Sequence, residues 1–322
     1  MLSKNCLSIE SQAEILLNSQ RSMNSKKICF SKEYIDGKIL MKDSSVSICS
    51  IVRDCQKNLE KNIPRIDHLR SQFKDSEVII FENDSKDNTL KILKNWERRS
   101  YNVHVFSDTY KTSTIPLNNK GNENPYFSIS RINKMVVYRN KYIHFLNNSG
   151  IKRDYVIVID LDIADFCLDG LVHSFGTSID WDCISANGIS VSSTFRKQYH
   201  DSYALIEYGA LEQTQTEQSI KLNRCRYSFL KRGMPFFLVD SAYGGLAIYK
   251  WSSIKDIYYS YLINNDDRVQ CKSEHVGFHG KMKENGHSLI FINPSMTVKY
   301  RSISIKFLIL KLSEKFKTTK YF

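Results

Sequence analysis

Four short runs of apolar residues most strongly restrict what this chain can fold into. They cover residues 46–52, 78–81, 103–106 and 155–159, and segments with a helical spacing of apolar residues lie between them. Strands without polar alternation are typical of a sheet that is buried on both faces. The alternation of such strands with helices predicts parallel pairing. We therefore expect an α/β fold with a Rossmann-like, mostly parallel central sheet covered by helices on both faces.

The polarity of the chain divides it into three parts. Residues 1–43 form a polar N-terminal extension, residues 44–300 carry the strand and helix patterns, and residues 301–322 form a basic tail. Within the main domain we place a boundary after residue 162, just past the most apolar strand. With 322 residues, the chain is long enough to bury the core of one large α/β domain.

The tail combines basic and apolar residues. It carries six Lys or Arg residues and one acid, Glu314, which gives a net charge of 6 − 1 = +5. As a helix, it would place Ile305, Leu308, Ile309 and Leu312 on one stripe, a pattern typical of a segment that lies in a membrane interface. The alternative is that this stripe packs on the main domain as a closing helix.

The whole chain is basic, with a formal net charge of +12. It has no helix-turn-helix, zinc-finger or RNA-recognition signature, so we expect no nucleic-acid partner. Attraction to anionic membranes or to phosphate-bearing substrates, or a basic surface without a role, explains the charge instead. No apolar stretch reaches about 20 residues, and residues 1–21 do not resemble a secretory signal. These features predict a cytoplasmic protein, with peripheral contact at the inner face of the membrane.

Two carboxylates follow the most apolar strand directly. Asp160 and Asp162 come at the carboxyl end of residues 155–159, which is the edge where open α/β sheets bind ligands. Both side chains can converge on one ion, and Mg²⁺ or Mn²⁺ bridged to substrate phosphates suits such oxygen ligands. The alternative is a solvated loop, because acidic residues are common after strands.

A second predicted strand also ends in acidic residues. Residues 78–81 lead into Glu82, Asn83 and Asp84, and either Asp87 or Asn88 can cap the helix that follows. Capping explains Asp87 but leaves Asp84 without a role. Asp84 at the tip of the strand could accept hydrogen bonds from a base or a ribose.

The order of these motifs resembles that of the GT-A glycosyltransferases, especially the family-2-like group and its mannosyltransferase relatives with an "ENDS" motif. The resemblance runs over residues 46–300. It comprises an opening strand, an acid-ended strand, an Arg-Asn helix, a DxD strand and an acidic pair at a helix start. In this chain the five motifs are, in order, Ser50-Ile51-Val52-Arg53-Asp54, Glu82-Asn83-Asp84-Ser85-Lys86-Asp87-Asn88-Thr89, Arg139-Asn140, Asp160-Leu161-Asp162 and Ser273-Glu274-His275.

The resemblance implies a metal-dependent glycosyltransferase of hexosyltransferase type. Such an enzyme moves a sugar from a nucleotide-sugar donor to a hydroxyl of a glycan or lipid-linked acceptor, here in surface polysaccharide assembly. Residues 44–162 would form the nucleotide-binding half and residues 163–300 the acceptor half.

The same resemblance implies roles for individual residues. Arg139 would steady the phosphates or Asp160; the alternative is an ordinary arginine on a helix surface. A divalent ion, Mn²⁺ or Mg²⁺, would bind to Asp160 and Asp162. The nucleotide-sugar would contact Ser50, Arg53, Asp84, Arg139 and Asp160.

Glu274 occupies the place of the family's acidic catalytic pair, whose second acid is replaced by His275. A carboxylate at a helix start can remove the proton of an acceptor hydroxyl. The alternative is that Ser273 caps the helix and Glu274 favours the helix dipole. His275 and His279 lie four residues apart and share a helix face, so His279 is a candidate third metal ligand.

Paired glycines, Gly244 and Gly245, precede a short apolar segment. They can let the backbone approach a sugar or a diphosphate closely, and the alternative is a plain tight turn.

Two other classes of function are alternatives to glycosyl transfer. Asp160 could be the nucleophile of a haloacid-dehalogenase-like phosphatase, but Ala164 and the mid-chain position of the motif disfavour it. The chain could also be a non-catalytic, GT-A-like protein associated with membranes or carbohydrates. The presence of Asp84, Asp160, Asp162 and Glu274 argues against a loss of activity.

Overall fold

The computed structural model describes residues 31–112, 124–192 and 196–300. The basic tail at 301–322 and the first 30 residues of the predicted N-terminal extension therefore lie outside the described residues. Within the described ranges, no helix is both long and apolar enough to cross a membrane.

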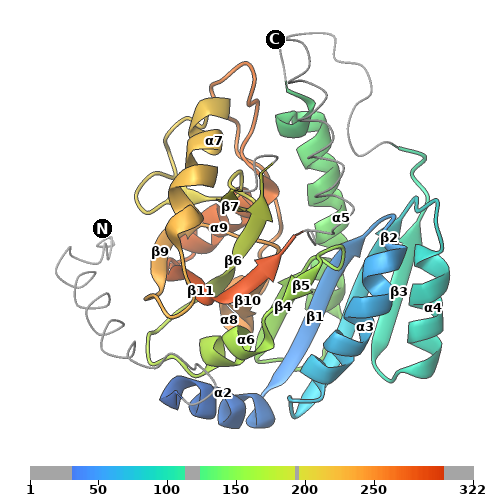
Figure 1. Cartoon of the computed structure of the whole chain (residues 1–322). Coiled ribbons are helices and arrows are strands. Elements are labelled where there is room, and N and C mark those ends of the chain that lie inside the picture. Colours follow the sequence, from blue (N-terminus) through green and yellow to red (C-terminus); the bar gives the residue numbers. More distant parts are fainter. Residues whose placement is uncertain (1–30, 113–123, 193–195, 301–322) are drawn as a thin grey trace, which may run out of the picture.

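The strands of the described residues form one sheet of eleven strands, and nine of them follow the order β3-β2-β1-β4-β10-β6-β11-β9-β8 (Figure 1). The short strands β5 and β7 pair off this path with β11 and β6. The strands are β1 (Ser45–Val52), β2 (Asp75–Asn83), β3 (Val103–Asp108), β4 (Tyr155–Ile159), β5 (Asp165–Phe166), β6 (Cys183–Val191), β7 (Lys197–Tyr199), β8 (Ile206–Glu207), β9 (Phe237–Ser241), β10 (Leu246–Lys250) and β11 (Ile290–Lys299).

The four predicted apolar runs form the parallel group β3-β2-β1-β4. On the other side of β4 lies β10, which is antiparallel both to β4 and to β6. Strand β11 is parallel to β6, and β9 is antiparallel to β11. Along the nine-strand path, only β10 and β9 therefore run against the others. The predicted α/β class and mostly parallel sheet are confirmed.

Helices cover both faces of the sheet. One buried cluster joins α2, α3, α4 and α6 to the sheet, and a second joins α5, α8 and α9 to the opposite face. Alternate residues of β4 enter the two clusters, Ile157 and Ile159 on one face and Val156 and Val158 on the other. The helices are α2 (Lys32–Asp43), α3 (Gln56–Arg70), α4 (Thr89–Arg99), α5 (Ile129–Asn148), α6 (Leu168–Phe175), α7 (Glu217–Arg226), α8 (Trp251–Ile254) and α9 (Glu274–Glu284), with short 3₁₀ turns η2 (Pro125–Phe127) and η3 (Tyr227–Phe229).

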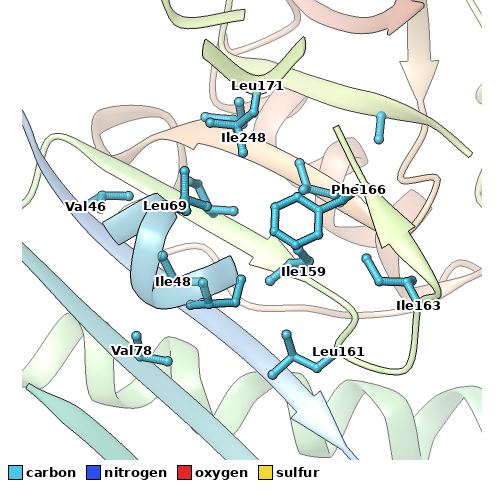
Figure 2. Packing of buried hydrophobic residues seen from close by; sticks show 14 of the residues in the cluster. Val46, Ile48, Leu69, Val78, Ile159, Leu161, Ile163, Phe166, Leu171 and Ile248 are labelled. Carbon is cyan, nitrogen blue, oxygen red and sulfur yellow. The ribbon is translucent and has the colours of Figure 1, made fainter. Parts of the chain in front are cut away.

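The first of these clusters anchors the segment that carries Asp160 and Asp162. Leu161 and Ile163 are buried beside Ile159 in this cluster (Figure 2). Each of the two acids therefore has buried apolar neighbours in the chain, which hold the backbone at the end of β4 against the core. The packing explains why a segment outside regular structure has a defined position.

Part of the predicted N-terminal extension is a helix packed on the domain. Helix α2 begins after Ser31, whose side chain accepts a hydrogen bond from the backbone N–H of Tyr34. It lies against α6 at a separation that only glycine permits. A Cβ on Gly37 would lie 2.0 Å from the carbonyl oxygen of Val172, and one on Gly176 would lie 1.9 Å from that of Glu33.

We predict that Gly37→Ala lowers the free energy of unfolding by about 1–3 kcal/mol, because a backbone oxygen cannot move away from the new methyl group. This steric cost should exceed the roughly 1 kcal/mol that alanine gains over glycine in helix propensity, so the variant should be less stable than the wild type. Urea denaturation measures the effect. Ile39→Ala, an exposed change on the same helix, is the matched control and should stay within about 0.5 kcal/mol of the wild type. Equal stability of the two variants would contradict the prediction.

Candidate active-site cleft

A cleft of about 800 Å³ opens at the carboxyl ends of β1 and β4. Its walls come from both sides of the 162/163 boundary. Arg53, Arg139, Asp160 and Asp162 are among the lining residues that precede the boundary. The lining residues that follow it include Asp201, Tyr243, Glu274 and His275. A volume of this size is typical of small-molecule sites.

The backbone around Asp160 and Asp162 is held by hydrogen bonds from two directions. The buried amide of Asn62, on α3, donates to the carbonyl oxygens of Leu161 at 3.1 Å and Ile163 at 2.8 Å. From the other side, the backbone N–H of Asp160 donates to the carbonyl of Gly245 at 3.0 Å. The two carboxylates therefore sit on a fixed segment, with Asp160 half-buried and Asp162 exposed.

Arg139 lines the cleft and is only 3% exposed. Its Nε donates to Glu274 Oε1 at 2.9 Å, and its Nη2 lies 3.7 Å from Asp160 Oδ1. The rings of Tyr243 and Tyr259 flank it at 5.1 and 5.7 Å from their centroids. Arg139 is therefore not a surface arginine, and its role in steadying the phosphates or Asp160 stays a prediction.

Asp160 accepts a hydrogen bond in addition to its contact with Arg139, and its pKa is raised. The hydroxyl of Tyr243 donates to Asp160 Oδ1 at 2.8 Å. Burial raises the pKa of Asp160 to about 7; Arg139 opposes this rise, and the nearby charge of Asp162 adds to it. When both are charged, the carboxylates of Asp160 and Asp162 repel each other, which favours a cation between them.

The donor set fits a divalent ion that is shared with a substrate. Within the described ranges, no group of three or more His, Cys, Asp or Glu residues could hold a metal by itself. Mg²⁺ commonly uses one or two protein carboxylates and takes its other ligands from phosphates and water. Asp160 and Asp162 line the cleft together and supply those two carboxylates.

Glu274 and His275 begin α9 and face the same cleft. The side chain of Ser273 accepts a hydrogen bond from the N–H of Val276, so the predicted cap is present. His275 is stacked on Tyr243 with ring centroids 3.8 Å apart, and burial lowers its pKa well below the usual range. In the described structure neither ring nitrogen of this neutral histidine has a hydrogen-bond partner.

The structure does not support His279 as a metal ligand. Its ring is fully buried, where Nδ1 lies 2.8 Å from Ser241 Oγ and Nε2 lies 3.0 Å from the Tyr249 hydroxyl. Both nitrogens are thus occupied, and the side chain is not among those that line the cleft. It lies one helical turn beyond His275, beneath the sheet, so a shared helix face does not bring it to the site.

The paired glycines have a structural use instead of the predicted contact with a sugar. Gly244 and Gly245 have φ values of 66° and 90°, which disfavour other residues, and they form the turn that leads into β10. A Cβ on Gly244 would lie 2.3 Å from the carbonyl oxygen of Ala186. Neither glycine lines the cleft, but the carbonyl of Gly245 positions the backbone of Asp160.

Two further residues predicted at the nucleotide have their side chains engaged elsewhere. The carboxylate of Asp84 accepts hydrogen bonds from the backbone N–H groups of Tyr110 at 2.9 Å and Lys111 at 3.0 Å. Burial raises its pKa, but these and other hydrogen bonds outweigh that effect and keep the pKa below the ordinary value. Asp84 therefore holds a loop, and its neighbour Asn83 lines the cleft. The side chain of Ser50 is buried and is not part of the lining.

Asp201 lines the cleft, although no role is predicted for it from the sequence. It lies in an aromatic stretch at residues 199–203 and adopts a left-handed φ of 64°. Burial raises its pKa to about 8, and the charges of Glu274 and Asp160 add to the rise. An acid within an aromatic segment was a usable signal, but the backbone turn that points it toward the cleft is not visible in the sequence.

No protein-family model matches this chain, and no curated protein does. Among solved structures, S. aureus TarS residues 1–349 is 15% identical, with 83% of this chain covered and a TM-score of 0.39. The chain spans 63% of the length of that structure. A mannosyltransferase from Pyrobaculum calidifontis in complex with GDP-Man and Mn²⁺ is 10% identical, with coverages of 94% and 75% and a TM-score of 0.42.

Glucosyl-3-phosphoglycerate synthase from Mycobacterium tuberculosis is also similar, at 10% identity, coverages of 87% and 83%, and a TM-score of 0.41. Because all three identities and TM-scores are low, these likenesses establish nothing about the activity of this chain.

We predict that Arg139→Met lowers the free energy of unfolding by roughly 3–5 kcal/mol, because it leaves a buried carboxylate without its partner. Combining it with Glu274→Gln should cost less than the sum of the two single changes, since the uncompensated charge is then removed. Urea denaturation of the full cycle measures both effects. Arg98→Met, an exposed change on α4, is the control. Strict additivity would show that the ion pair contributes nothing.

Proposed function

We propose that this protein is a metal-dependent glycosyltransferase that moves a hexose from a nucleotide-sugar donor to a hydroxyl of a glycan or lipid-linked acceptor. One observation carries the proposal. Asp160 and Asp162 lie at the carboxyl edge of the parallel strands, in a cleft where Arg139 connects Asp160 to Glu274. The motif order that resembles the GT-A enzymes, including the "ENDS"-type element, supports it. Surface polysaccharide assembly is the role that we assign to it.

The donor lies across the ends of β1, β2 and β4. Arg53, Asp54 and Asn83 line this part of the cleft and offer hydrogen bonds to the nucleoside. The diphosphate lies toward Asp160 and Asp162, which would hold Mg²⁺ or Mn²⁺ between them. When bound, the ion neutralises the charge that develops on the departing diphosphate.

Glu274 is oriented for work on the acceptor. Its contacts recorded in the described structure, with Arg139 and His275, both reach Oε1. Oε2 is then the oxygen that accepts the proton of the acceptor hydroxyl as the bond to the sugar forms. Asp201, on the wall that follows the 162/163 boundary, is placed to accept a second hydroxyl of the acceptor.

We predict that Asp160→Asn or Asp162→Asn lowers turnover roughly 100-fold or more, since several kcal/mol of charge stabilisation depend on the ion that they hold. Titration calorimetry with UDP and GDP should show binding that strengthens with Mn²⁺ in the wild type and not in either variant. Asp180→Asn, an exposed acid in a surface ion pair, is the control. Full turnover in excess chelator would refute the role of a metal.

We predict that Glu274→Gln lowers kcat by about 10²–10⁴-fold, the usual contribution of a general base, with little change in the KM for the donor. Glutamine keeps the size of the side chain and an oxygen for Arg139, so the fold should remain intact. Steady-state kinetics with a panel of nucleotide sugars measures the split. A raised donor KM at unchanged kcat would instead place Glu274 in donor binding.

A further inference from the structure

A long stretch between the cleft residues Asp201 and Tyr243 is without acids. Residues 218–239 contain no Asp or Glu, and they span most of α7, all of η3 and the loop that leads into β9. Strand β7 packs against α7 and η3, and it adds the basic residue Lys197, with Arg196 just before it. Together they form a basic surface, all of whose members are exposed: Arg196, Lys197, Lys221, Arg224, Arg226, Lys231 and Arg232.

The charge of the basic surface is only partly compensated. Arg226 pairs with Glu207 at 2.7 Å, and Arg232 with Asp169 at 3.4 Å. No ion pair is recorded for Lys221, Arg224 or Lys231 within the described ranges. The acid nearest to Lys221 and Arg224 in the chain, Glu217, is engaged by Asn124 and by Arg268 at 3.1 Å. The acid nearest to Lys231 in the chain, Asp240, pairs with Lys283 at 2.7 Å.

Two large apolar side chains are exposed within the same segment. Leu222 is 60% exposed and Phe229 is 44% exposed. Ile220 and Tyr227 point into the core, so α7 turns Leu222 outward together with its basic neighbours. Apolar side chains surrounded by Lys and Arg are typical of surfaces that lie in a membrane interface, where the basic groups reach lipid headgroups.

The basic surface lies at the same edge of the sheet as the cleft. Strand β7 pairs with the carboxyl end of β6, where Val191 is opposite Lys197. Strand β6 runs in the same direction as β1 and β4, whose carboxyl ends form the cleft. In Figure 1, the arrow of β6 points toward the end of the molecule where α7 lies. A plane in contact with the basic surface would therefore lie near the opening of the cleft.

We propose that the basic surface docks on an anionic lipid membrane. The other candidates for a partner of this surface are themselves positively charged, so they would be repelled by it. Residues 1–30 carry 4 − 2 = +2, residues 301–322 carry +5, and a second copy of the chain carries +12. Leu222 and Phe229 favour a lipid interface over a polyanion, because a lipid interface has an apolar layer that these side chains can enter and a polyanion has none. This proposal goes beyond glycosyl transfer and does not depend on it.

Sedimentation of the full chain with vesicles tests the proposal. The vesicles are made of phosphatidylcholine alone, or of equal parts phosphatidylcholine and phosphatidylglycerol. Lys221→Gln/Arg224→Gln/Lys231→Gln removes three of the charges that have no ion pair, and should weaken binding to the anionic vesicles about 100-fold, from the usual contribution of a basic residue near such a surface. The wild type should also bind more weakly as salt rises.

A matched variant separates this surface from the overall charge. Lys91→Gln/Arg98→Gln/Arg99→Gln changes three exposed residues of α4, which lies beside the opposite end of the sheet, and leaves the same net charge of 12 − 3 = +9. It should bind the vesicles within about threefold of the wild type, as expected for charges beyond a Debye length from the lipid. Equal losses in both variants, or a loss in neither, would overturn the proposal.

The apolar residues provide an independent arm. Leu222→Ser/Phe229→Ser keeps every charge and should weaken vesicle binding about tenfold or more through the lost burial of two side chains. Binding equal to that of the wild type would show that the surface attracts phosphates without entering the membrane, and would overturn the proposal. Thermal unfolding of each variant confirms that the fold is intact. Because vesicle binding is measured without turnover, the membrane proposal is tested independently of the proposed glycosyltransferase activity.

Discussion

The cleft depends on the ion pairs of Arg139 with Asp160 and Glu274. Arg139 is a buried cation placed between Asp160, at the end of β4, and Glu274, at the start of α9. Without a positive charge between them, two carboxylates in a partly buried site would repel each other. The ring faces of Tyr243 and Tyr259 add favourable contacts with the cation. One side chain thus joins elements from both sides of the 162/163 boundary and fixes the spacing of the acids across the cleft.

Local signals in the sequence were sufficient for the first half of the fold. The apolar runs became β1 to β4 because strands buried on both faces cannot carry polar alternation, and β4 has buried residues on both faces. The direction of β10 could not be predicted in this way. A run such as Leu246–Lys250 can pair in either direction, and its place between β4 and β6 depends on contacts with residues far away in the chain. Helix α2 was missed because the apolar stripe of Tyr34, Leu40 and Met41 is interrupted by Gly37, the position at which the helix approaches α6 closely.

For the site too, the sequence indicates the position of some residues and not of others. The sequence places Asp160 and Asp162 at a strand end and Glu274 at a helix start, and strand ends of parallel sheets share an edge, so the structure brings these residues to one cleft. Their catalytic roles stay predictions. His279 was misplaced because sequence spacing shows which helix face a residue shares but not how deeply that residue is buried. Asp84 was misplaced because the sequence does not show its backbone φ. His279 lies beneath the sheet, and the left-handed φ of 52° at Asp84 turns its carboxylate toward a loop.

The position of β4 between β1 and β10 also constrains how the chain reaches this structure during synthesis. The strands β3, β2, β1 and β4 are complete at residue 159, but the partner of the free edge of β4 begins at residue 246, which is 246 − 159 = 87 residues later. At about 5–20 residues per second, the ribosome leaves that parallel edge unpaired for roughly 4–17 seconds. Such an edge can pair with a neighbouring nascent chain. The backbone of Asp160, which needs the carbonyl of Gly245, becomes fixed only when this interval ends.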